Sequence, residues 1–189
     1  MIYIRIANEK INSIAPQVLA EEALKIGALF VHYSTDYVVD GSKNSPYLET
    51  DTENPVNAYG RTKLAGEQAV RSSGCDYLIF RTSWVYASRG HNFLVTILML
   101  AKESQELSIV ADQIGSPTTA RVIAEMSARC IEQAMSERKT ASFKSGLYHL
   151  TTSGHTSWHG FAEEIVKAAT KINGYQFAVK VINGIPTAD

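Results

Sequence analysis

Apolar residues along this chain follow two alternating patterns. Five short runs are rich in β-branched and aromatic residues, and five longer segments repeat their apolar positions with the period of a helix. The first run is continuously apolar (Ala28-Leu29-Phe30-Val31), as expected of a strand buried on both faces. The expected strands are 28–33, 77–83, 107–111, 147–151 and 177–182, and the expected helices are 15–26, 58–72, 92–104, 119–135 and 157–172.

The alternation of helices and strands predicts βαβ units, and therefore an α/β fold with a parallel sheet covered on both faces. Gly27, Gly74 and Gly174 follow three of the expected helices, where glycine commonly ends a helix. A polar, turn-forming segment over 40–55 follows the first strand directly. Open α/β sheets bind ligands at this carboxyl edge, so we expect the long loop to be functional.

Composition excludes several classes of protein. The 189 residues include 18 Lys+Arg and 19 Asp+Glu, so the net charge of −1 gives no basic excess for nucleic acid. No apolar run approaches the roughly 18 residues of a membrane span, and residues 1–6 lack the order of a signal peptide, which predicts a cytoplasmic protein. Cys75 and Cys130 belong to no metal or disulfide motif and are expected to be free thiols.

The twelve glycines include no pair separated by two or three positions, so the chain has no G-x-G-x-x-G turn. A nucleotide-binding α/β protein usually places such a turn after its first strand, where a helix N-terminus holds the pyrophosphate. The part of the fold that binds the nucleotide half of a dinucleotide is therefore not recognisable in this sequence.

Tyr59 and Lys63 stand one turn apart on one face of an expected helix. The ordinary pKa of a phenol is near 10, and a nearby ammonium stabilises the phenolate and lowers that pKa toward neutrality. Such a pair suits a proton donor. The spacing alone is weak evidence, because about 0.5 such pairs are expected by chance in a chain of this composition. A solvated lysine beside a half-buried tyrosine is the alternative.

A hydroxyl residue strengthens the first interpretation. Ser34 and Thr35 directly follow the first expected strand, and a Ser or Thr with Tyr59 and Lys63 forms a triad for carbonyl reduction, in which hydroxyl and phenol bind the keto oxygen. His32, Ser34 and Asp36 offer the residue types of a hydrolase instead. Residues two apart on a strand are separated by about 6.6 Å, which exceeds the roughly 3 Å of a hydrogen-bonded relay, so we exclude a hydrolase.

His155, His159 and Glu163 are spaced four residues apart at the start of the last long helix and superficially resemble metal ligands. His155 precedes the expected helix cap, and an acidic residue in an early turn is favoured by the helix dipole. No metal site is therefore expected. Trp158 is interpreted as a core residue, with a ligand-stacking role as the alternative.

Six motifs occur in order along nearly the whole chain, which is far more specific than one Tyr-x-x-x-Lys pair. They are HYSTDYV (32–38), YGRTKLAGE (59–67), FRTSWVY (80–86), DQIGSPT (112–118), GLYHL (146–150) and IPT (185–187). Through these motifs the chain closely resembles the dTDP-4-dehydrorhamnose reductase family, which belongs to the extended short-chain dehydrogenases/reductases.

The resemblance implies a Rossmann-like parallel sheet with a smaller α/β substrate-binding region. Residues 1–88 are expected to form the catalytic half of an NAD(P)-binding domain. Residues 89–189 are expected to be mainly substrate-binding, with 105–135 returning to the Rossmann-like sheet. Family members begin with a Gly-rich βαβ unit and continue beyond the IPT motif, so the chain is expected to be truncated at both ends.

The implied reaction is reduction of the 4-keto group of dTDP-4-dehydro-L-rhamnose by NADPH or NADH, which yields dTDP-L-rhamnose for cell-surface polysaccharide. By resemblance, Tyr59 is the catalytic acid, and Lys63 is its partner and also contacts the nicotinamide ribose. Thr35 polarises the keto oxygen. Asp36 contacts the substrate, and Trp84 is the aromatic residue of the substrate pocket.

The same resemblance suggests that Asn12 supports the catalytic lysine, as a helix asparagine does in many of these enzymes. It also raises magnesium as a cofactor and a homodimer as the assembly. The competing hypothesis is a non-catalytic regulatory subunit with the reductase fold, like that of methionine adenosyltransferase. The intact set of Thr35, Tyr59, Lys63 and Trp84 favours the enzyme.

Overall fold

The computed structural model describes residues 7–172 and 175–187, and the chain divides into two units. Unit 1 contains Met1–Thr82 and Ser127–Leu150, and unit 2 contains Ser83–Met126 and Thr151–Asp189. Each unit has hydrophobic clusters of its own. The candidate site residues of the sequence analysis are therefore divided between two bodies.

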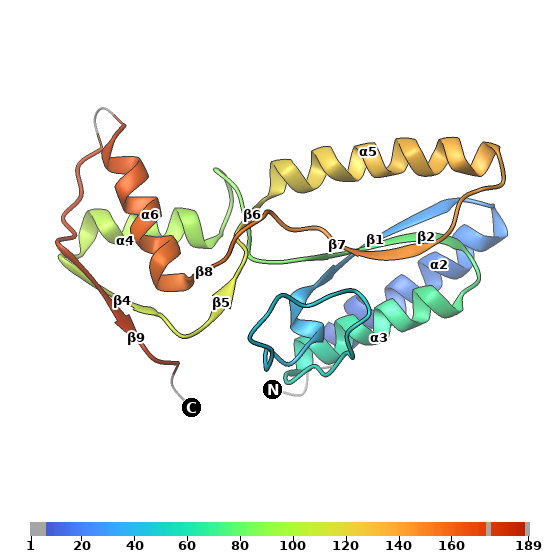
Figure 1. The fold of residues 1–189 in the computed structure, drawn as a ribbon, viewed down its shortest axis with the longest axis horizontal. Coiled ribbons are helices and arrows are strands. Elements are labelled where there is room, and N and C mark those ends of the chain that lie inside the picture. Colours follow the sequence, from blue (N-terminus) through green and yellow to red (C-terminus); the bar gives the residue numbers. More distant parts are fainter. Residues whose placement is uncertain (1–6, 173–174, 188–189) are drawn as a thin grey trace. The chain divides into compact units, whose positions relative to one another are not determined.

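Unit 1 is built on a parallel sheet in the order β1-β2-β7. Helices α2 and α3 cover one face, and the second part of α5 covers the other (Figure 1). The π-helical turn η1 continues directly into α2, and the 3₁₀ turn η2 follows β1. The bounds are η1 Lys10–Ile14, α2 Ala15–Lys25, β1 Leu29–Thr35, η2 Asp36–Val38, α3 Ala58–Ser72, β2 Asp76–Thr82, α5 Ala120–Lys139 and β7 Gly146–His149.

Successive residues of β1 serve the two faces of this sheet in turn. Phe30 packs in the cluster under α2 and α3, whereas Leu29 and Val31 pack in the cluster under α5. On the α5 face the Tyr33 phenol donates a 2.8 Å hydrogen bond to the hydroxyl of Ser127. The residues at even-numbered positions of β1 therefore face α3, the helix that carries the Tyr-x-x-x-Lys pair.

The described residues of unit 2 form three short strand pairs and two helices, and the first part of α5 also belongs to this unit. The pairs β3–β6 and β4–β9 are parallel, and β5–β8 is antiparallel. Its core gathers aromatic and aliphatic side chains of α4, α6, β4 and β9. The bounds are β3 Val85–Tyr86, α4 Phe93–Glu103, β4 Glu106–Val110, β5 Ile114–Gly115, β6 Thr118–Thr119, β8 Thr156–Ser157, α6 Trp158–Thr170 and β9 Val181–Ile185.

The predicted α/β class is confirmed, since parallel strands alternate with helices. Each of the expected helices and strands overlaps an observed one, and α3 has the expected bounds. Gly27 and Gly74 follow their helices with positive φ (62° and 80°), whereas Gly174 lies outside the described residues.

The expected domain boundaries need correction. The change between units falls after Thr82 instead of after residue 88, and residues 105–135 do not return to the sheet as one block. Strand β4 pairs with β9, because Ile109 and Ile182 pack in the core of unit 2. Helix α5 passes from unit 2 to unit 1 between residues 126 and 127, and β7 is the strand that joins the sheet.

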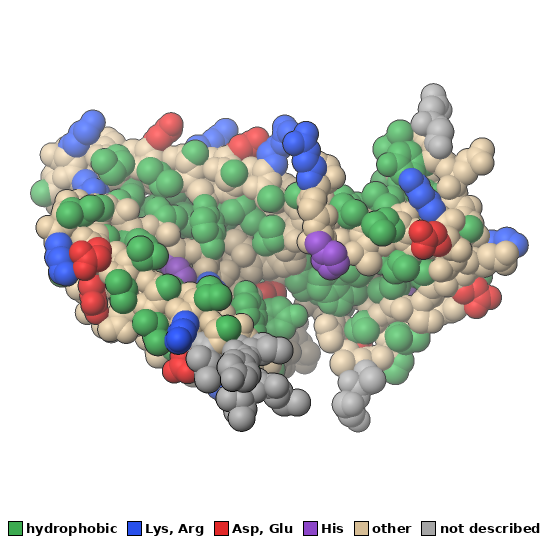
Figure 2. All heavy atoms as spheres, turned by 180° about the vertical axis from the view of Figure 1, so that it is seen from behind, with side chains coloured by type: hydrophobic (Ala, Val, Ile, Leu, Met, Phe, Trp, Pro, Cys, Tyr) green, Lys and Arg blue, Asp and Glu red, His purple; other side chains and the backbone are tan. Residues whose placement is uncertain are grey.

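The surface carries charges of both signs. On the face shown in Figure 2, acidic and basic side chains are interspersed, with apolar side chains between them. Within the described residues there is no helix with the length and apolarity needed to cross a membrane.

Candidate functional site

Thr35 is positioned by the turn that ends β1. Its hydroxyl accepts a 3.2 Å hydrogen bond from the backbone N–H of Tyr37 and caps η2. The same oxygen donates to Oδ1 of Asp36 at 3.0 Å. Since Thr35 is 6% exposed and bonded on both sides, its hydroxyl has a fixed position at the carboxyl edge of the sheet.

Tyr59 is brought to Thr35 by the start of α3. Asn57 caps this helix by accepting a 2.8 Å hydrogen bond from the N–H of Gly60. A Cβ at Gly60 would overlap the carbonyl oxygen of Tyr37, so the first turn of α3 rests directly on η2. The Tyr59 and Tyr37 rings meet edge to face, 5.8 Å apart, and the Thr35 hydroxyl lies near enough to the Tyr59 phenol to affect its pKa.

The electrostatics of Tyr59 differ from the sequence-based expectation. Partial burial raises the pKa of the Tyr59 phenol, the nearby Thr35 hydroxyl opposes the rise, and the Asp36 carboxylate and Tyr37 add to it. Lys63 was expected to lower this pKa. Its ammonium instead donates a 2.5 Å hydrogen bond to the backbone carbonyl of Tyr33, so in this structure it is held against β1.

Lys63 lies in a partly buried setting between α3 and β1. Burial lowers the pKa of its ammonium, and the Glu67 carboxylate acts in the opposite direction. Burial, together with the Lys63 charge, lowers the pKa of His32 to about 4. His32 is therefore neutral at pH 7, and Lys63 is the cation at this point of the sheet.

The hydrolase interpretation also fails on geometry. His32 and Ser34 are 8% and 5% exposed, and within the described part of the chain neither His32 Nε2 nor Ser34 Oγ has a hydrogen-bond partner. The two side chains thus form no relay with each other. They face α3, in line with the even-numbered positions of β1.

Asn12 contacts α3 at a different residue from the expected one. Its Nδ2 donates to the Thr62 hydroxyl at 3.2 Å, and that hydroxyl donates in turn to the carbonyl of Tyr59. A Cβ at Gly66 would overlap the Asn12 carbonyl oxygen, so the π-helical turn that carries Asn12 lies tightly against α3. Asn12 therefore supports the helix beside Lys63.

Trp84 belongs to unit 2, whereas the residues above belong to unit 1, and it has an unusual positive φ of 45°. Its ring stacks on Trp158 with centroids 3.4 Å apart and planes 6° apart. A Cβ at Gly115 would overlap the other side of the indole. Sequence reasoning missed this stacking because the two tryptophans are 74 residues apart and no local pattern links them.

Trp158 also serves the core of unit 2, as the sequence analysis expected. Its ring packs against Phe93, with centroids 4.5 Å apart, and its Nε1 donates a 3.3 Å hydrogen bond to Oε1 of Gln113. Trp158 therefore belongs to the hydrophobic cluster of unit 2 and also stacks on Trp84.

The long loop after β1 is fastened to the sheet of unit 1 by carboxylates. Oε1 of Glu49 accepts a 2.8 Å hydrogen bond from the backbone N–H of His149 in β7. Oε1 of Glu53 accepts one from Arg81 in β2 at 3.0 Å. Nearer the strand, Asp40 accepts from the Tyr47 phenol and from the Asn54 amide. The loop thus has a defined conformation.

Metal ligands do not cluster in the described ranges: residues 7–172 and 175–187 contain no group of three or more His, Cys, Asp or Glu that could hold an ion. His159 Nε2 lies 3.0 Å from the carbonyl of Ile182, and its Nδ1 lies 3.6 Å from Glu163. The His159 ring therefore joins α6 to β9.

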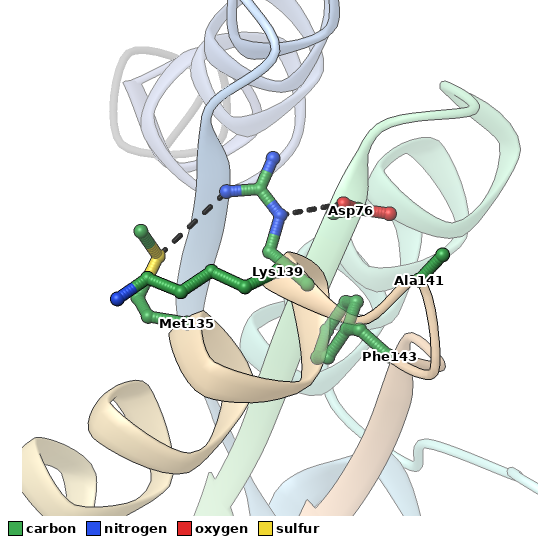
Figure 3. Close-up of a pocket in the computed structure, with 6 residues that line it drawn as sticks. Asp76, Met135, Lys139, Ala141 and Phe143 are labelled. Carbon is green, nitrogen blue, oxygen red and sulfur yellow. Dashed lines mark hydrogen bonds and ion pairs between the residues drawn. The ribbon is translucent and has the colours of Figure 1, made fainter.

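A cavity of about 460 Å³ lies at the opposite end of the unit 1 sheet (Figure 3). Arg138 lines it and donates to Asp76 at 2.8 Å and to the Gly27 carbonyl at 2.5 Å. Asp76 begins β2, whereas Thr35 pairs with the last residue of that strand, about 20 Å away along the strand. The cavity is therefore separate from the Thr35–Tyr59 site. Its lining residues are Asp76, Met135, Arg138, Lys139, Ala141 and Phe143.

Comparison with known proteins reveals similarity along nearly the whole chain. Among curated relatives, the dTDP-4-dehydrorhamnose reductase of Burkholderia thailandensis is 54% identical over 183 residues, covering 96% of this chain and 61% of the relative. The Escherichia coli K12 enzyme of the same name is 45% identical, with 94% and 58% covered. The chain thus spans about 60% of the length of these relatives.

Solved structures give the same result. The dTDP-4-dehydrorhamnose reductase from Bacillus anthracis, determined in complex with NADP, is 36% identical with a TM-score of 0.82, over 93% of this chain and 57% of that one. The Clostridium acetobutylicum protein is 38% identical with a TM-score of 0.80, over 95% and 58%. The model of the family described as RmlD substrate binding domain matches residues 5–189, and the chain belongs to this family.

Proposed function

We propose that this chain carries the proton-transfer residues of an NAD(P)H-dependent oxidoreductase that reduces the 4-keto group of dTDP-4-dehydro-L-rhamnose to dTDP-L-rhamnose. One observation carries the proposal: the Tyr59 phenol and Thr35 hydroxyl meet at the carboxyl edge of a parallel sheet, one helical turn from Lys63. Relatives of this chain bear the name of that enzyme.

The proposed roles follow from the donors available at this edge. Tyr59 donates its proton to the keto oxygen as that oxygen becomes an alcohol, and the raised pKa keeps the phenol protonated at neutral pH. Thr35 donates a hydrogen bond to the same oxygen and stabilises its developing charge. A hydroxyl has one proton, so Thr35 must release Asp36 to do this. In this proposal Asp36 accepts a substrate hydroxyl in place of the Thr35 hydroxyl.

The residues present fit the nicotinamide half of a dinucleotide. A reduced nicotinamide supplies the hydride when it is bound. An ammonium has three N–H donors, and among the described residues Lys63 gives one of them to the Tyr33 carbonyl, so it retains donors for the hydroxyls of a ribose. Tyr59 and Lys63 are the residues that we assign to this contact. The NADP in the Bacillus anthracis structure supports NADPH or NADH as the cofactor.

The nucleotide sugar is the proposed ligand of Asp36 and of Trp84. Asp36 offers a carboxylate for sugar hydroxyls, and Trp84 offers an aromatic side chain for the substrate pocket. The ring faces of Trp84 are covered by Trp158 and Gly115, so its exposed edge is the part that can contact substrate unless Trp158 moves. A homodimer in the cytoplasm is also part of the proposal. The described residues offer no cluster for magnesium, and we assign it no step.

The regulatory-subunit hypothesis receives no support from the comparisons, because these relatives are named as reductases. The test is an assay of ketosugar-dependent NADPH oxidation by the natural polypeptide that carries this chain, with dTDP-L-rhamnose identified as the product. We expect turnover that requires both substrates. Cofactor and ketosugar binding without turnover would instead indicate a regulatory role.

A further inference from the structure

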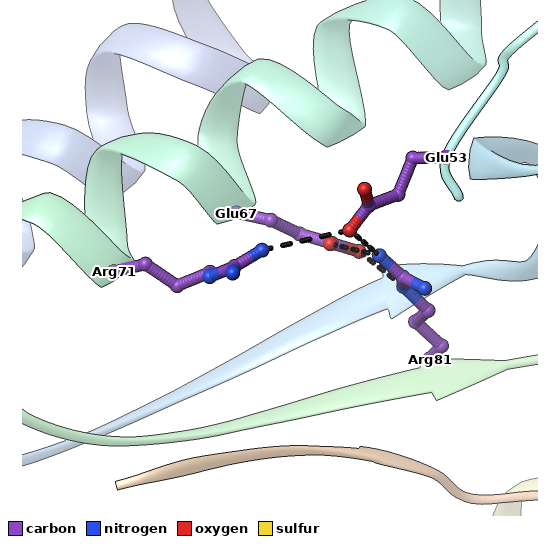
Figure 4. Close-up of polar contacts among 4 residues, drawn as sticks. All are labelled: Glu53, Glu67, Arg71 and Arg81. Carbon is purple, nitrogen blue, oxygen red and sulfur yellow. Dashed lines mark hydrogen bonds and ion pairs between the residues drawn. The ribbon is translucent and has the colours of Figure 1, made fainter. Parts of the chain in front are cut away.

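A buried ion pair joins α3 to β2 behind the candidate site. Glu67 is 0% exposed and Arg81 is 2% exposed. Oε1 of Glu67 accepts from Arg81 Nε at 3.0 Å, and Oε2 accepts from Arg81 Nη2 at 2.7 Å, which makes the pair bidentate (Figure 4). Glu53, from the long loop, accepts from the same Nη2 at 3.0 Å. Arg71 contacts Glu53 at 3.5 Å.

Both residues of the ion pair are in line with residues of the candidate site, Glu67 along α3 and Arg81 across the sheet from the end of β1. Tyr59, Lys63 and Glu67 follow one another at four-residue intervals and so lie along one face of α3. Arg81 pairs in register with Ser34, one position before Thr35 pairs with Thr82. A bidentate contact permits little sliding or rotation, so this ion pair sets the position of α3 relative to the end of β1.

We propose that Glu67 is a positioning residue for Lys63: its buried carboxylate, held by Arg81, fixes the Lys63 side chain and its charge against the Tyr33 carbonyl. The proposal rests on the proposed function, in which Lys63 contacts the cofactor. Arg81 holds the Glu67 carboxylate in place. Glu53 also accepts a hydrogen bond from Arg81, but it does not lie on the face of α3 that carries Lys63.

The charges around Lys63 support this role. Glu67 lies on the same helix, His32 interacts with Lys63 from β1, and Arg81 extends from β2 behind Glu67. His32 is neutral at pH 7 and Arg81 is positive, so Glu67 supplies the negative charge among these groups. Burial disfavours the ammonium form of Lys63, and the Glu67 carboxylate opposes that effect.

The test is a pair of matched variants. Glu67→Gln keeps the size of the side chain, removes its charge and replaces one accepting oxygen with an NH2 donor. Glu53→Gln does the same to the other carboxylate on Arg81 Nη2. In protein labelled with [ε-¹³C]lysine, the Lys63 signal is identified by its absence from Lys63→Arg and titrated with pH. We expect the Lys63 pKa to fall by roughly one unit in E67Q and to change by less than half as much in E53Q.

A second readout separates positioning from stability. In the ketosugar assay, we expect E67Q to lower kcat with little change in KM and to move the alkaline limb of the pH profile to lower pH. We expect Glu67→Asp, which keeps the charge, to restore the position of that limb. Equal effects of E67Q and E53Q on the Lys63 titration would overturn the proposal.

The experiments remain informative if E67Q does not fold or if the wild-type protein is inactive. Should E67Q fail to fold, the charge-retaining E67D variant still tests the idea, since a displaced Lys63 titration in E67D contradicts it. The NMR titration does not depend on turnover. An inactive wild-type protein would therefore refute the proposed function, whereas an unaltered Lys63 titration in E67Q would refute this inference.

Discussion

The two units position their candidate residues by different forces. In unit 1, Thr35, Tyr59 and Lys63 are fixed by hydrogen bonds and buried charges at the edge of a parallel sheet. In unit 2, Trp84 is fixed by stacking on Trp158 and by a glycine that leaves room for its ring. Unit 1 should therefore respond to changes of charge and pH, and unit 2 to changes of side-chain volume.

This contrast can be measured separately in each unit. Both tryptophans of the chain, Trp84 and Trp158, lie in unit 2, so tryptophan fluorescence reports on that unit. Hydrogen exchange of the amides of β1 and β2 reports on unit 1.

Tyr59→Phe removes the proposed proton donor and keeps the ring that packs against Tyr37. We expect ketosugar reduction to fall by roughly 100- to 10,000-fold, with hydrogen exchange in β1 unchanged. Tyr37→Phe, which keeps the same ring contact, is the matched control and should retain most activity. Full activity in the Tyr59 variant would remove Tyr59 from the mechanism.

Trp158→Ala removes the stacking partner of Trp84 and a member of the unit 2 core. We expect unit 2 to lose about 3 kcal/mol of unfolding free energy, the lower end for a large aromatic residue because Trp158 is only partly buried. The fluorescence of the remaining Trp84 should shift to longer wavelength. Trp158→Phe should lose less than half as much. An equal loss of protection in β1 would show that the units are not independent.

His32 should make unit 1 sensitive to acid. Its pKa is about 4 in the folded protein and near 6.5 when unfolded, so the unfolded chain binds more protons between these values. Stability therefore falls as pH falls through this range. We expect a loss of about 2 kcal/mol from pH 7 to pH 5, seen as faster exchange in β1. In His32→Gln the part of this stability loss that comes from His32 should be absent, and only the contribution of other titrating groups should remain.

The helix caps give the smallest effect and compare the units directly. Asn57 caps α3 in unit 1, and Asn92 caps α4 in unit 2 by accepting from Val95. We expect Asn57→Ala to cost about 1 kcal/mol. Asn92→Ala should cost more, because Asn92 Nδ2 also donates to the carbonyls of Ala87 and Arg89. Thermal unfolding, followed by tryptophan fluorescence and by hydrogen exchange, measures both losses. A larger loss of unfolding free energy in Asn57→Ala than in Asn92→Ala would contradict this prediction.

Local patterns predicted the helices and strands of unit 1 well. The continuous apolar run at the start of β1 and the helical period of α3 are written in short stretches of sequence, and Thr35, Tyr59 and Lys63 lie on those elements. That Tyr59 meets Thr35 follows from the general rule that ligands bind at the carboxyl edge of such sheets.

Contacts between distant segments could not be predicted in this way. Pairing of β4 with β9 depends on a shared core across more than 70 residues, so the expected return of 105–135 to the sheet required correction. The stacking of Trp84 on Trp158 has the same origin. The orientation of Lys63 toward Tyr33 depends on the backbone of β1, which the spacing of Tyr59 and Lys63 does not reveal.

Gly60 and Gly66 of α3 lie directly against backbone carbonyl groups, and this limits which substitutions selection can accept in the helix. Gly60 and Gly66 each carry a helix-propensity penalty of about 1 kcal/mol relative to alanine, yet a methyl group at either would overlap backbone carbonyl oxygen of Tyr37 or Asn12. In a library of random substitutions these positions should reject even alanine. The exposed Gln68 on the same helix should accept many residues. The intolerant sites of this helix would then include two that lack a side chain.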